Sequence, residues 1–508
     1  MPTTATELLR GSLAGWRGLA VAAVIGAAAS LSFAPVGWWP LAILAPASLF
    51  LAWGAAAPRR AAALGFAFAA GLFGTGTYWL YTAVHDFGGA PAALAVVLML
   101  GLVALMASYY AILGYAVTRW TADGAARRLV VLPAGWLLLE WLRGWLFTGF
   151  PWLEIGYAPI DTPLAGLAPV AGVHAMTLAA ALSAGVLAAL VRGATRERVA
   201  ACALLLLVWV GAGALWGRAW TSPSGAPLGV ALVQGAIPQD LKWQADNREA
   251  TLALYERLTT PALGRPLIVW PEAALPLLEH EAREYLGRMW GRTRASGSDL
   301  VLGLLRYDFE SRKYYNGMVA LSDDATWYYK RRLVPFGEFF PVPETVRGWM
   351  RLMSLPYVDM TAGPDGQAPL RAAGQLLGAT ICYEDAYGAE QLAVLGQATL
   401  LVNVTNNAWF GDSTAPHQQL QMARLRALEA GRFLARATSN GVTAVIGPDG
   451  AVRARIPQFV PGVLYADVVP HTGLTPYART GDWPVLGLAL FGLLGGAFAS
   501  RRRGTRVS

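Results

Sequence analysis

The sequence predicts a multi-domain membrane protein, in which a bundle of eight transmembrane helices carries an α/β domain. Three observations lead to this prediction. Hydrophobic residues make up 55% of the 508 residues and charged ones only 14%, whereas soluble proteins are about one-quarter charged. Eight apolar stretches each approach the ~20 residues that a bilayer core requires. Between the seventh and the eighth, charges increase and short apolar runs alternate with helical patterns, as in α/β domains.

The positions of the apolar stretches set the predicted domain boundaries. The stretches lie at residues 17–34, 38–55, 62–84, 92–118, 129–148, 163–191, 199–217 and 482–500. We therefore expect a bundle of seven helices over residues 1–217, an α/β domain over 218–481, and an eighth helix with a basic tail over 482–508. The first stretch is not expected to be a cleavable signal peptide, because it is one of a series and lacks a convincing cleavage site.

The arginines give the predicted bundle an orientation. They gather before the first stretch, after the second, fourth and sixth, and after the eighth, whereas the loops 85–91 and 149–162 contain no lysine or arginine. By the positive-inside rule, both ends of the chain are cytoplasmic and residues 218–481 lie outside. The net charge of +8 is thus explained by membrane orientation, and a nucleic-acid partner is not expected.

Three polar residues lie in or beside the apolar stretches. Glu140 and Arg143 are three residues apart, so on a helix they share a face and can form an ion pair. Such a pair would fix helix packing or bind a lipid headgroup, and the sequence leaves both interpretations open. His85 lies in a glycine-containing outer loop, where structural hydrogen bonding is expected.

The α/β domain is predicted to contain nine strands and three helices. The strands are expected at residues 230–234, 267–270, 300–304, 317–321, 326–330, 376–381, 400–404, 442–446 and 463–468, and the helices at 248–258, 281–294 and 418–438. The loop 405–412 mixes amides with aromatic residues, and it either lines a pocket or forms a plain turn. Residues 339–374 show no regular pattern, which is typical of a lid or binding loop. The large apolar residues of that segment would contact acyl chains or pack on the domain: Trp349, Met350, Met353, Leu355, Tyr357 and Met360.

Three reactive side chains stand at the ends of predicted strands. Cys382 ends the run GATIC, just before an expected helix start at Asp385 that would favour a thiolate. Glu272 ends the run IVWPE, and Lys330 ends an aromatic strand. Taken singly, the thiol is typical of a small buried side chain and the two charges of solvated strand ends. Together they favour an active site in which Glu272 takes the thiol proton and Lys330 stabilises the charge that develops on an attacked carbonyl.

The second cysteine makes a structural disulfide improbable. Cys202 lies inside an apolar run, away from the predicted α/β domain. A catalytic thiol that must stay free in an oxidising compartment is consistent with the lack of a soluble partner cysteine.

The motifs WPE, YxKxxLVPFGE and CYE, in this order, resemble the nitrilase superfamily with its Glu-Lys-Cys triad. The membrane segments and the motifs LVPFGE and CYED narrow the resemblance to the apolipoprotein N-acyltransferases of bacterial inner membranes. The resemblance implies a periplasmic αββα sandwich and a thioester acyl-enzyme. It implies a membrane phospholipid as acyl donor and, as acceptor, the α-amine of an apolipoprotein's lipid-modified N-terminal cysteine. It further implies that Glu338, Tyr383, Glu384 and Trp243 support activity. We expect neither a cofactor nor a metal.

Two other functions use parts of the same pattern. A membrane-tethered amidase would need the triad but no access for lipids, and the apolar segment 339–374 argues against it. A transporter or scaffold with a degenerate outer domain would have no reason to keep all three reactive residues at strand ends. An acyl adduct on Cys382 is expected only for the acyltransferase.

Overall fold

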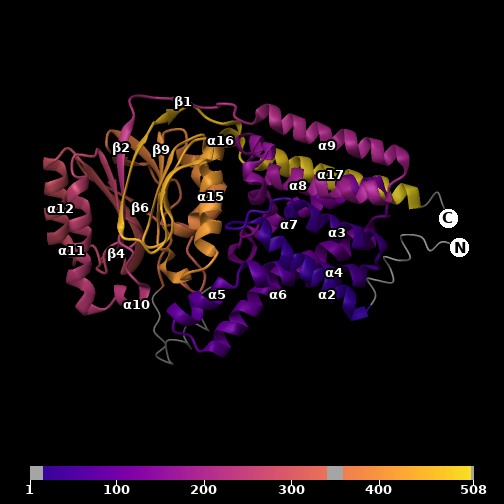
Figure 1. Ribbon diagram of the computed structural model, residues 1–508, viewed down its shortest axis with the longest axis horizontal. Helices are drawn as coiled ribbons and strands as arrows, with labels where there is room; N and C mark the ends of the chain where they lie inside the picture. The colour runs from indigo at the N-terminus through magenta and orange to yellow at the C-terminus, as the bar shows by residue number, and fades with distance from the viewer. Residues whose placement is uncertain (1–14, 340–358, 505–508) are drawn as a thin grey trace. The chain divides into compact units, whose positions relative to one another are not determined.

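The computed structural model describes residues 15–339 and 359–504, and the chain divides into two compact units. Unit 1 consists of Met1–Arg218 and Thr480–Ser508, and unit 2 of Ala219–Arg479. Figure 1 shows helices in the first and a layered α/β arrangement in the second. Residues 340–358 of the predicted lid lie outside the described residues, among them Trp349, Met350, Met353, Leu355 and Tyr357.

Unit 1 is helical. Its helices are α2 (Gly15–Ala29), α3 (Leu41–Ala55), α4 (Pro58–Gly76), α5 (Trp79–Thr82), α6 (Ala92–Trp120), α7 (Leu132–Arg143), α8 (Ala168–Arg192), α9 (Thr195–Leu215) and α17 (Trp483–Gly504). Within the described residues, five helical segments are long and apolar enough to cross a membrane: Gly15–Ser32, Ala92–Trp120, Pro163–Arg192, Thr195–Leu215 and Trp483–Ser500. A sixth is possible if α4 and the helical segment Trp79–Phe87, which are bent by 53°, form one span.

The predicted count of eight spans stays a prediction. Helix α3 is apolar but only 15 residues long. The stretch predicted at residues 129–148 contains α7, whose 12 residues continue directly from the π-helical turn Arg127–Val131. At 1.5 Å per residue, a helix as short as α3 crosses only part of a ~30 Å hydrocarbon core. Composition therefore locates apolar segments but does not measure the length of the helix that each one forms.

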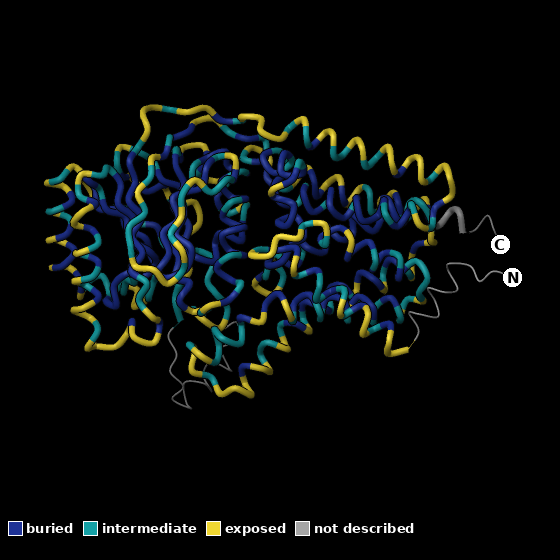
Figure 2. The backbone as a smooth tube through the Cα atoms, in the orientation of Figure 1, coloured by how far each residue is buried: buried dark blue, intermediate teal, exposed yellow. Residues whose placement is uncertain are grey.

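Helix α9 turns most of its apolar side chains outward. Leu206, Leu207 and Val210 are 65%, 70% and 60% exposed, and Figure 2 shows exposed residues recurring along the helix. Cys202 is also exposed on this helix. A continuous exposed apolar face is unfavourable in water but well suited to lipid. Unit 1 thus carries several helices compatible with membrane spans.

Glu140 and Arg143 are fully buried, but they do not form the expected ion pair. Both instead hold the segment that follows α7. A Glu140 oxygen accepts a hydrogen bond from the main-chain N–H of Ile155 at 3.1 Å. Nη1 of Arg143 donates to the carbonyls of Phe150 and Trp152 at 2.7 and 2.6 Å. Glu140 also accepts from Nε1 of Trp136 at 3.0 Å and from the Thr177 hydroxyl at 2.9 Å, whereas Nε and Nη2 of Arg143 have no hydrogen-bond partner among the described residues.

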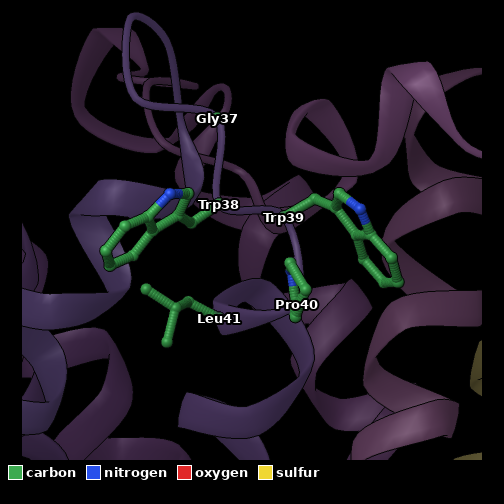
Figure 3. Close-up of a pocket in the computed structure, with 5 residues that line it drawn as sticks. All are labelled: Gly37, Trp38, Trp39, Pro40 and Leu41. Carbon is green, nitrogen blue, oxygen red and sulfur yellow. The ribbon is translucent and has the colours of Figure 1, made fainter.

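Other loops of unit 1 are fixed by local contacts. His85 bonds through Nδ1 to the carbonyl of Ala90 at 2.8 Å, so its expected structural hydrogen bond is confirmed. An open hollow in unit 1 is lined by Gly37, Trp38, Trp39, Pro40 and Leu41. Figure 3 shows the two indoles of this hollow pointing away from each other. It contains none of the predicted site residues, so it carries no argument about the chemistry.

Unit 2 contains two six-stranded mixed sheets. The first has the order β13-β2-β3-β4-β5-β6 and the second β12-β11-β10-β9-β8-β7. Strands of the first sheet are β2 (Leu228–Gln234), β3 (Leu267–Val269), β4 (Asp299–Asp308), β5 (Lys313–Leu321), β6 (Ala325–Tyr329) and β13 (Gly462–Val468). Strands of the second are β7 (Leu370–Ala372), β8 (Gln375–Ile381), β9 (Leu400–Thr405), β10 (Leu434–Thr438), β11 (Thr443–Ile446) and β12 (Val452–Ile456). The short strands β1 (Ser222–Pro223) and β14 (His471–Thr472) pair separately.

Helices cover the outer faces of both sheets. Figure 1 shows α11 (Arg248–Thr259) and α12 (Arg283–Ala295) on one side of the sheets, and α15 (Ala415–Ala430) on the other. The strands alternate accordingly: Val230 and Leu232 of β2 join the core between the sheets, whereas Ala231 and Val233 join the core beneath the helices. Unit 2 is thus a four-layered αββα arrangement. The short helices α10 (Gln239–Lys242), α14 (Gly388–Gln391) and α16 (Pro476–Thr480) complete the unit.

The helix predicted over residues 418–438 is wrong in its second half. Helix α15 ends at Ala430, Gly431 adopts the left-handed conformation with a φ of 61°, and the chain continues as strand β10. Glycine in this conformation is the usual way to stop a helix. Leucine, alanine and arginine favour helices on both sides of Gly431, and this propensity hid the stop signal.

Candidate active site

Glu272 follows β3 and is held by three neighbours. Its Oε1 accepts hydrogen bonds from Nδ2 of Asn316 at 2.7 Å and from Nζ of Lys330 at 3.4 Å. Its Oε2 accepts one from the main-chain N–H of Asn406 at 2.7 Å. Burial alone would raise the pKa of this carboxyl, but these three donors together hold it below its ordinary value. Glu272 is therefore ionised and oriented before any substrate arrives.

Lys330 follows β6 and lies between two carboxylates. Its Nζ is 2.8 Å from Oε1 of Glu338 and 3.4 Å from Oε1 of Glu272. Burial opposes the charge, but Glu272 and Glu338 outweigh it and raise the pKa of the ammonium above its ordinary value. Strand β6 runs in the same direction as β3, because two antiparallel pairings separate it from β4. The ends of both strands thus meet at one edge of the first sheet.

Cys382 follows β8 of the second sheet. It has a φ of 52°, and its carbonyl accepts a hydrogen bond from Nε2 of Gln419 at 2.8 Å. The expected helix after it is wrong, because Cys382–Ala386 forms a single 3₁₀ turn. Burial raises the pKa of the thiol, the charge of Glu272 adds to this effect, and Lys330 opposes it. The nucleophile at rest is therefore a protonated thiol, not the thiolate that a helix N-terminus would favour.

Glu338 fixes the direction of Lys330. Besides the 2.8 Å contact with that ammonium, its Oε1 accepts from Nδ2 of Asn316 at 2.8 Å. Its Oε2 accepts from the main-chain N–H of Val334 at 2.8 Å. Asn316 therefore links Glu338 and Glu272, so the two carboxylates share both an amide and an ammonium. Sequence reasoning missed Asn316, although a polar residue within the apolar run NGMVAL of β5 is a usable signal.

Glu384 joins the nucleophile turn to the chain that carries the lysine. Its oxygens accept from the main-chain N–H groups of Ile381 at 2.7 Å, Arg331 at 2.7 Å and Arg332 at 3.2 Å, and from the Tyr328 hydroxyl at 3.0 Å. Burial raises the pKa of Glu384, against the effect of these donors. Its hydrogen bonds point to a structural connection between the two sheets.

The loop 405–412 lines the site, which decides between the two interpretations of its sequence. Asn406 holds Glu272, as described above. Nδ2 of Asn407 donates to Oε1 of Gln419 at 2.7 Å, and Gln419 in turn binds the carbonyl of Cys382. This chain of contacts connects the loop to both the base and the nucleophile.

Tyr383 and Trp243 occupy different surroundings. Tyr383 is buried in the nucleophile turn, with its ring 5.2 Å from that of Tyr387. Trp243 follows α10 and is 48% exposed, and its ring lies 5.9 Å from Nζ of Lys242. Trp243 thus belongs to the surface near the site, whereas Tyr383 belongs to its interior.

A buried ion pair lies behind the nucleophile turn. Asp385 pairs with Arg436 of β10, and Nη1 of Arg436 also donates to Oδ1 of Asn403 at 2.7 Å. Burial raises the pKa of Asp385 to about 6, against the effect of Arg436. Arg436 was predicted in a helix, where it would not have reached Asp385. As part of strand β10, Arg436 reaches Asp385 in the turn after Cys382 from the face of the sheet that α15 covers.

The arrangement brings a thiol, a carboxylate and an ammonium into electrostatic interaction. Within residues 15–339 and 359–504, no three His, Cys, Asp or Glu side chains are placed to hold a metal ion. A thiol, a proton acceptor and a cation are the groups that attack of a sulfur on a carbonyl requires.

Comparisons with known proteins cover both units. Residues 25–186 match the family described as "Apolipoprotein N-acyltransferase N-terminal domain", and residues 229–477 match "Carbon-nitrogen hydrolase". Proteins named apolipoprotein N-acyltransferase from Azotobacter vinelandii and Pseudomonas syringae pv. tomato are each 42% identical to this chain, over 96% and 94% of its length and 96% of theirs. An amidase from Nesterenkonia of known structure is 21% identical, aligns with 52% of this chain and 96% of its own, and gives a TM-score of 0.37. Since the two bacterial relatives match over nearly their whole length, the chain belongs to the apolipoprotein N-acyltransferase family.

Proposed function

We propose that this protein transfers a fatty acyl chain from a membrane phospholipid to an apolipoprotein. The acceptor is the α-amino group of the diacylglyceryl-modified N-terminal cysteine, and the transfer is the last step of bacterial lipoprotein maturation. The observation that carries the proposal is the buried cluster in which Glu272 and Lys330 are bonded to each other and act on the thiol of Cys382. The relatives' shared name and the exposed apolar helices of unit 1 support the lipid substrates.

In the first half-reaction the enzyme becomes acylated. Glu272 accepts the thiol proton as the sulfur of Cys382 attacks an ester carbonyl of the phospholipid. Nζ of Lys330 and the main-chain N–H of Tyr383 stabilise the oxyanion. The carbon–oxygen bond to glycerol then breaks, and the leaving alkoxide takes the proton from Glu272. The products are a lysophospholipid and a thioester at Cys382.

In the second half-reaction the acyl chain passes to the acceptor. The neutral α-amine attacks the thioester carbonyl, and the oxyanion is again held by Lys330. Glu272 accepts a proton from the attacking nitrogen and returns it to the sulfur when the carbon–sulfur bond breaks. Both half-reactions therefore require Glu272 as a carboxylate at the start, which the lowered pKa of this group favours.

The supporting residues have separate roles in this scheme. Glu338 orients Lys330 through the 2.8 Å contact between Oε1 and Nζ. Glu384 positions the nucleophile turn through main-chain hydrogen bonds, and Tyr383 supplies an oxyanion donor. The exposed ring of Trp243 offers an apolar surface to an acyl chain.

The proposal also covers location and domain organisation. The protein spans the bacterial inner membrane eight times, with residues 1–217 as a seven-helix bundle and 482–508 as the eighth helix and cytoplasmic tail. Residues 218–481 form the periplasmic catalytic domain. The distribution of arginines supports this orientation, and the exposed apolar surface of α9 supports contact with the bilayer.

The test is the mass of the acyl-enzyme. The purified full chain is incubated in detergent with a phospholipid of defined acyl chains, without acceptor, and its intact mass is measured. We expect one added acyl chain, located on Cys382 by peptide mapping, and its loss when a diacylglyceryl-modified peptide is added.

Two variants serve as controls. Cys382→Ala should remain unmodified and inactive, whereas Cys202→Ala should react like the wild type, because Cys202 lies on α9 and takes no part in the candidate site. An adduct that persists in Cys382→Ala would place the chemistry elsewhere. Hydrolysis of small amides without any lipid adduct would instead identify an amidase.

A further inference from the structure

Lys242 is buried beside the candidate site, and the proposed reaction gives it no role. The chain contains three lysines: Lys330 belongs to the triad, Lys313 is exposed at the start of β5, and Lys242 ends α10. Lys242 is only 2% exposed, and its Nζ has no hydrogen-bond partner among the described residues. A buried, unpartnered ammonium destabilises a fold, so its presence requires a compensating benefit.

The charge that faces Lys242 is that of Glu272. Burial lowers the pKa of Lys242 to about 8, and the negative charge of Glu272 acts in the opposite direction. In return, Lys242 is one of the groups that lower the pKa of Glu272. The acidic residues on α10 and on the turn after it, Asp240 and Asp246, are exposed to solvent. Burial therefore outweighs the attraction of Glu272, and Glu272 is the carboxylate whose charge opposes it.

Side-chain contacts of α10 hold Lys242 near the base. Gln239 lies one helical turn before it on α10, and its Oε1 accepts a hydrogen bond from Nδ2 of Asn406 at 3.2 Å. The main-chain N–H of the same Asn406 donates to Glu272. One loop residue thus connects α10 with the base. On its other side, Nζ of Lys242 faces the half-exposed ring of Trp243 at 5.9 Å.

The charges of the cluster balance only when Lys242 is included. Glu272 and Glu338 are two carboxylates, and both bond to the single ammonium of Lys330. With Lys330 alone, two carboxylates would share a single cation, so the ionised form of Glu272 would be less favoured. The charge of Lys242 removes this imbalance without a hydrogen bond that would compete for the Glu272 oxygens.

We propose that Lys242 is a positioning residue whose charge keeps Glu272 ionised, so that the base can accept a proton in both half-reactions. The inference rests on the proposed acyl transfer, in which Glu272 is the base. It explains why an ammonium is retained where an apolar side chain would fit the interior better.

The test compares the pH dependence of acyl-enzyme formation in Lys242→Met, Lys242→Gln and wild-type full chain. Activity needs ionised Glu272, which is present above the pKa of that group. Removing the cation raises this pKa, so the acid limb of the rate should move to higher pH by about one unit in both variants. Lys242→Arg keeps a permanent charge and should keep the acid limb near the wild-type position. Lys313→Met removes an exposed lysine and should leave the limb unchanged.

The melting temperature separates a charge role from a packing role. Because methionine has a similar length and no charge to desolvate, Lys242→Met should melt at the wild-type temperature or above it. A folded Lys242→Met or Lys242→Gln protein with the wild-type acid limb overturns the inference, as does a lower melting temperature with an unshifted limb. Failure of the proposed function looks different, because the wild-type chain would then form no acyl adduct at any pH.

Discussion

At the scale of single residues, the site depends on one ammonium placed between two carboxylates. Lys330 is 1% exposed, and its contacts with Glu338 and Glu272 leave little room for a different shape. Lys330→Arg keeps the charge but replaces a compact group with a broad planar one. We expect the rate of acyl-enzyme formation to fall by ~100- to 1000-fold, as when one oxyanion donor is lost. The rate is measured from intact mass after mixing with phospholipid.

The matched control for Lys330→Arg is an ion pair of similar chemistry far from the triad. Arg288 and Glu284 form an exposed pair on α12, and Arg288→Lys should change the rate by less than twofold. A Lys330→Arg protein with wild-type kinetics would show that charge alone, without geometry, is sufficient at this position.

The candidate site residues could be located from the sequence because each ends a recognisable strand. Cys382, Lys330 and Glu272 follow apolar or aromatic runs; the structure pairs Lys330 with Glu272, and the charges of both act on the Cys382 thiol. Asn316 and Lys242 could not be placed in the same way. Asn316 stands out as a polar residue in an apolar strand, but its contacts depend on the pairing of β5 with β6, and the position of Lys242 depends on the packing of α10.

At the scale of secondary structure, Gly303 of strand β4 has no side chain, which lets the main chain of Glu272 pack closely against the strand. A Cβ atom added to Gly303 would lie 2.5 Å from Cα of Glu272 and 2.8 Å from the carbonyl oxygen of Pro271. Both are main-chain atoms and cannot move aside cheaply. Gly303→Ala should therefore displace Glu272, reduce the rate of acylation by at least tenfold and destabilise the fold by about 1–3 kcal/mol.

A second glycine provides the control for Gly303→Ala. Gly287 lies within α12, and a Cβ there would meet nothing within 4 Å. Gly287→Ala should leave activity unchanged and stabilise the protein by about 0.5–1 kcal/mol, because alanine favours helices. Thermal melting and acylation kinetics of both variants test the pair. Unchanged kinetics in Gly303→Ala would mean that the two strands can separate without disturbing the base.

Secondary structure was predicted best where a run of apolar residues was uninterrupted. Strands β2, β8 and β9 were located because they are continuous runs of buried residues. Strand β10 was missed because the helix-forming composition of α15 continues into it beyond Gly431. There, tertiary pairing with β9 overrides local propensity.

At the scale of the whole molecule, the distribution of arginines predicts opposite sides for the catalytic domain and the C-terminus. The loops 85–91 and 149–162 lack basic residues, whereas four arginines follow residue 500. Reporter enzymes that are active on only one side of the membrane, fused after Pro223 and at the C-terminus, should therefore give opposite signals. Signals from the same side would contradict an eight-span topology with both ends in the cytoplasm. Within the described residues, five helical segments are long and apolar enough to cross a membrane, or six if the bent pair forms one span.

The burial of the Cys382 thiol also determines how this protein can be followed in solution. An unfolded cysteine has a pKa of about 8.5 and alkylates readily near neutral pH, whereas the folded site keeps this thiol protonated and covered. Alkylation of Cys382 must then await a local opening of the nucleophile turn, just as amide hydrogen exchange awaits the opening of a hydrogen bond. Cys202, which is exposed on α9, is the other thiol of the chain. A chain with Cys202→Ala would therefore carry one natural label whose reaction rate records how often its own active site opens.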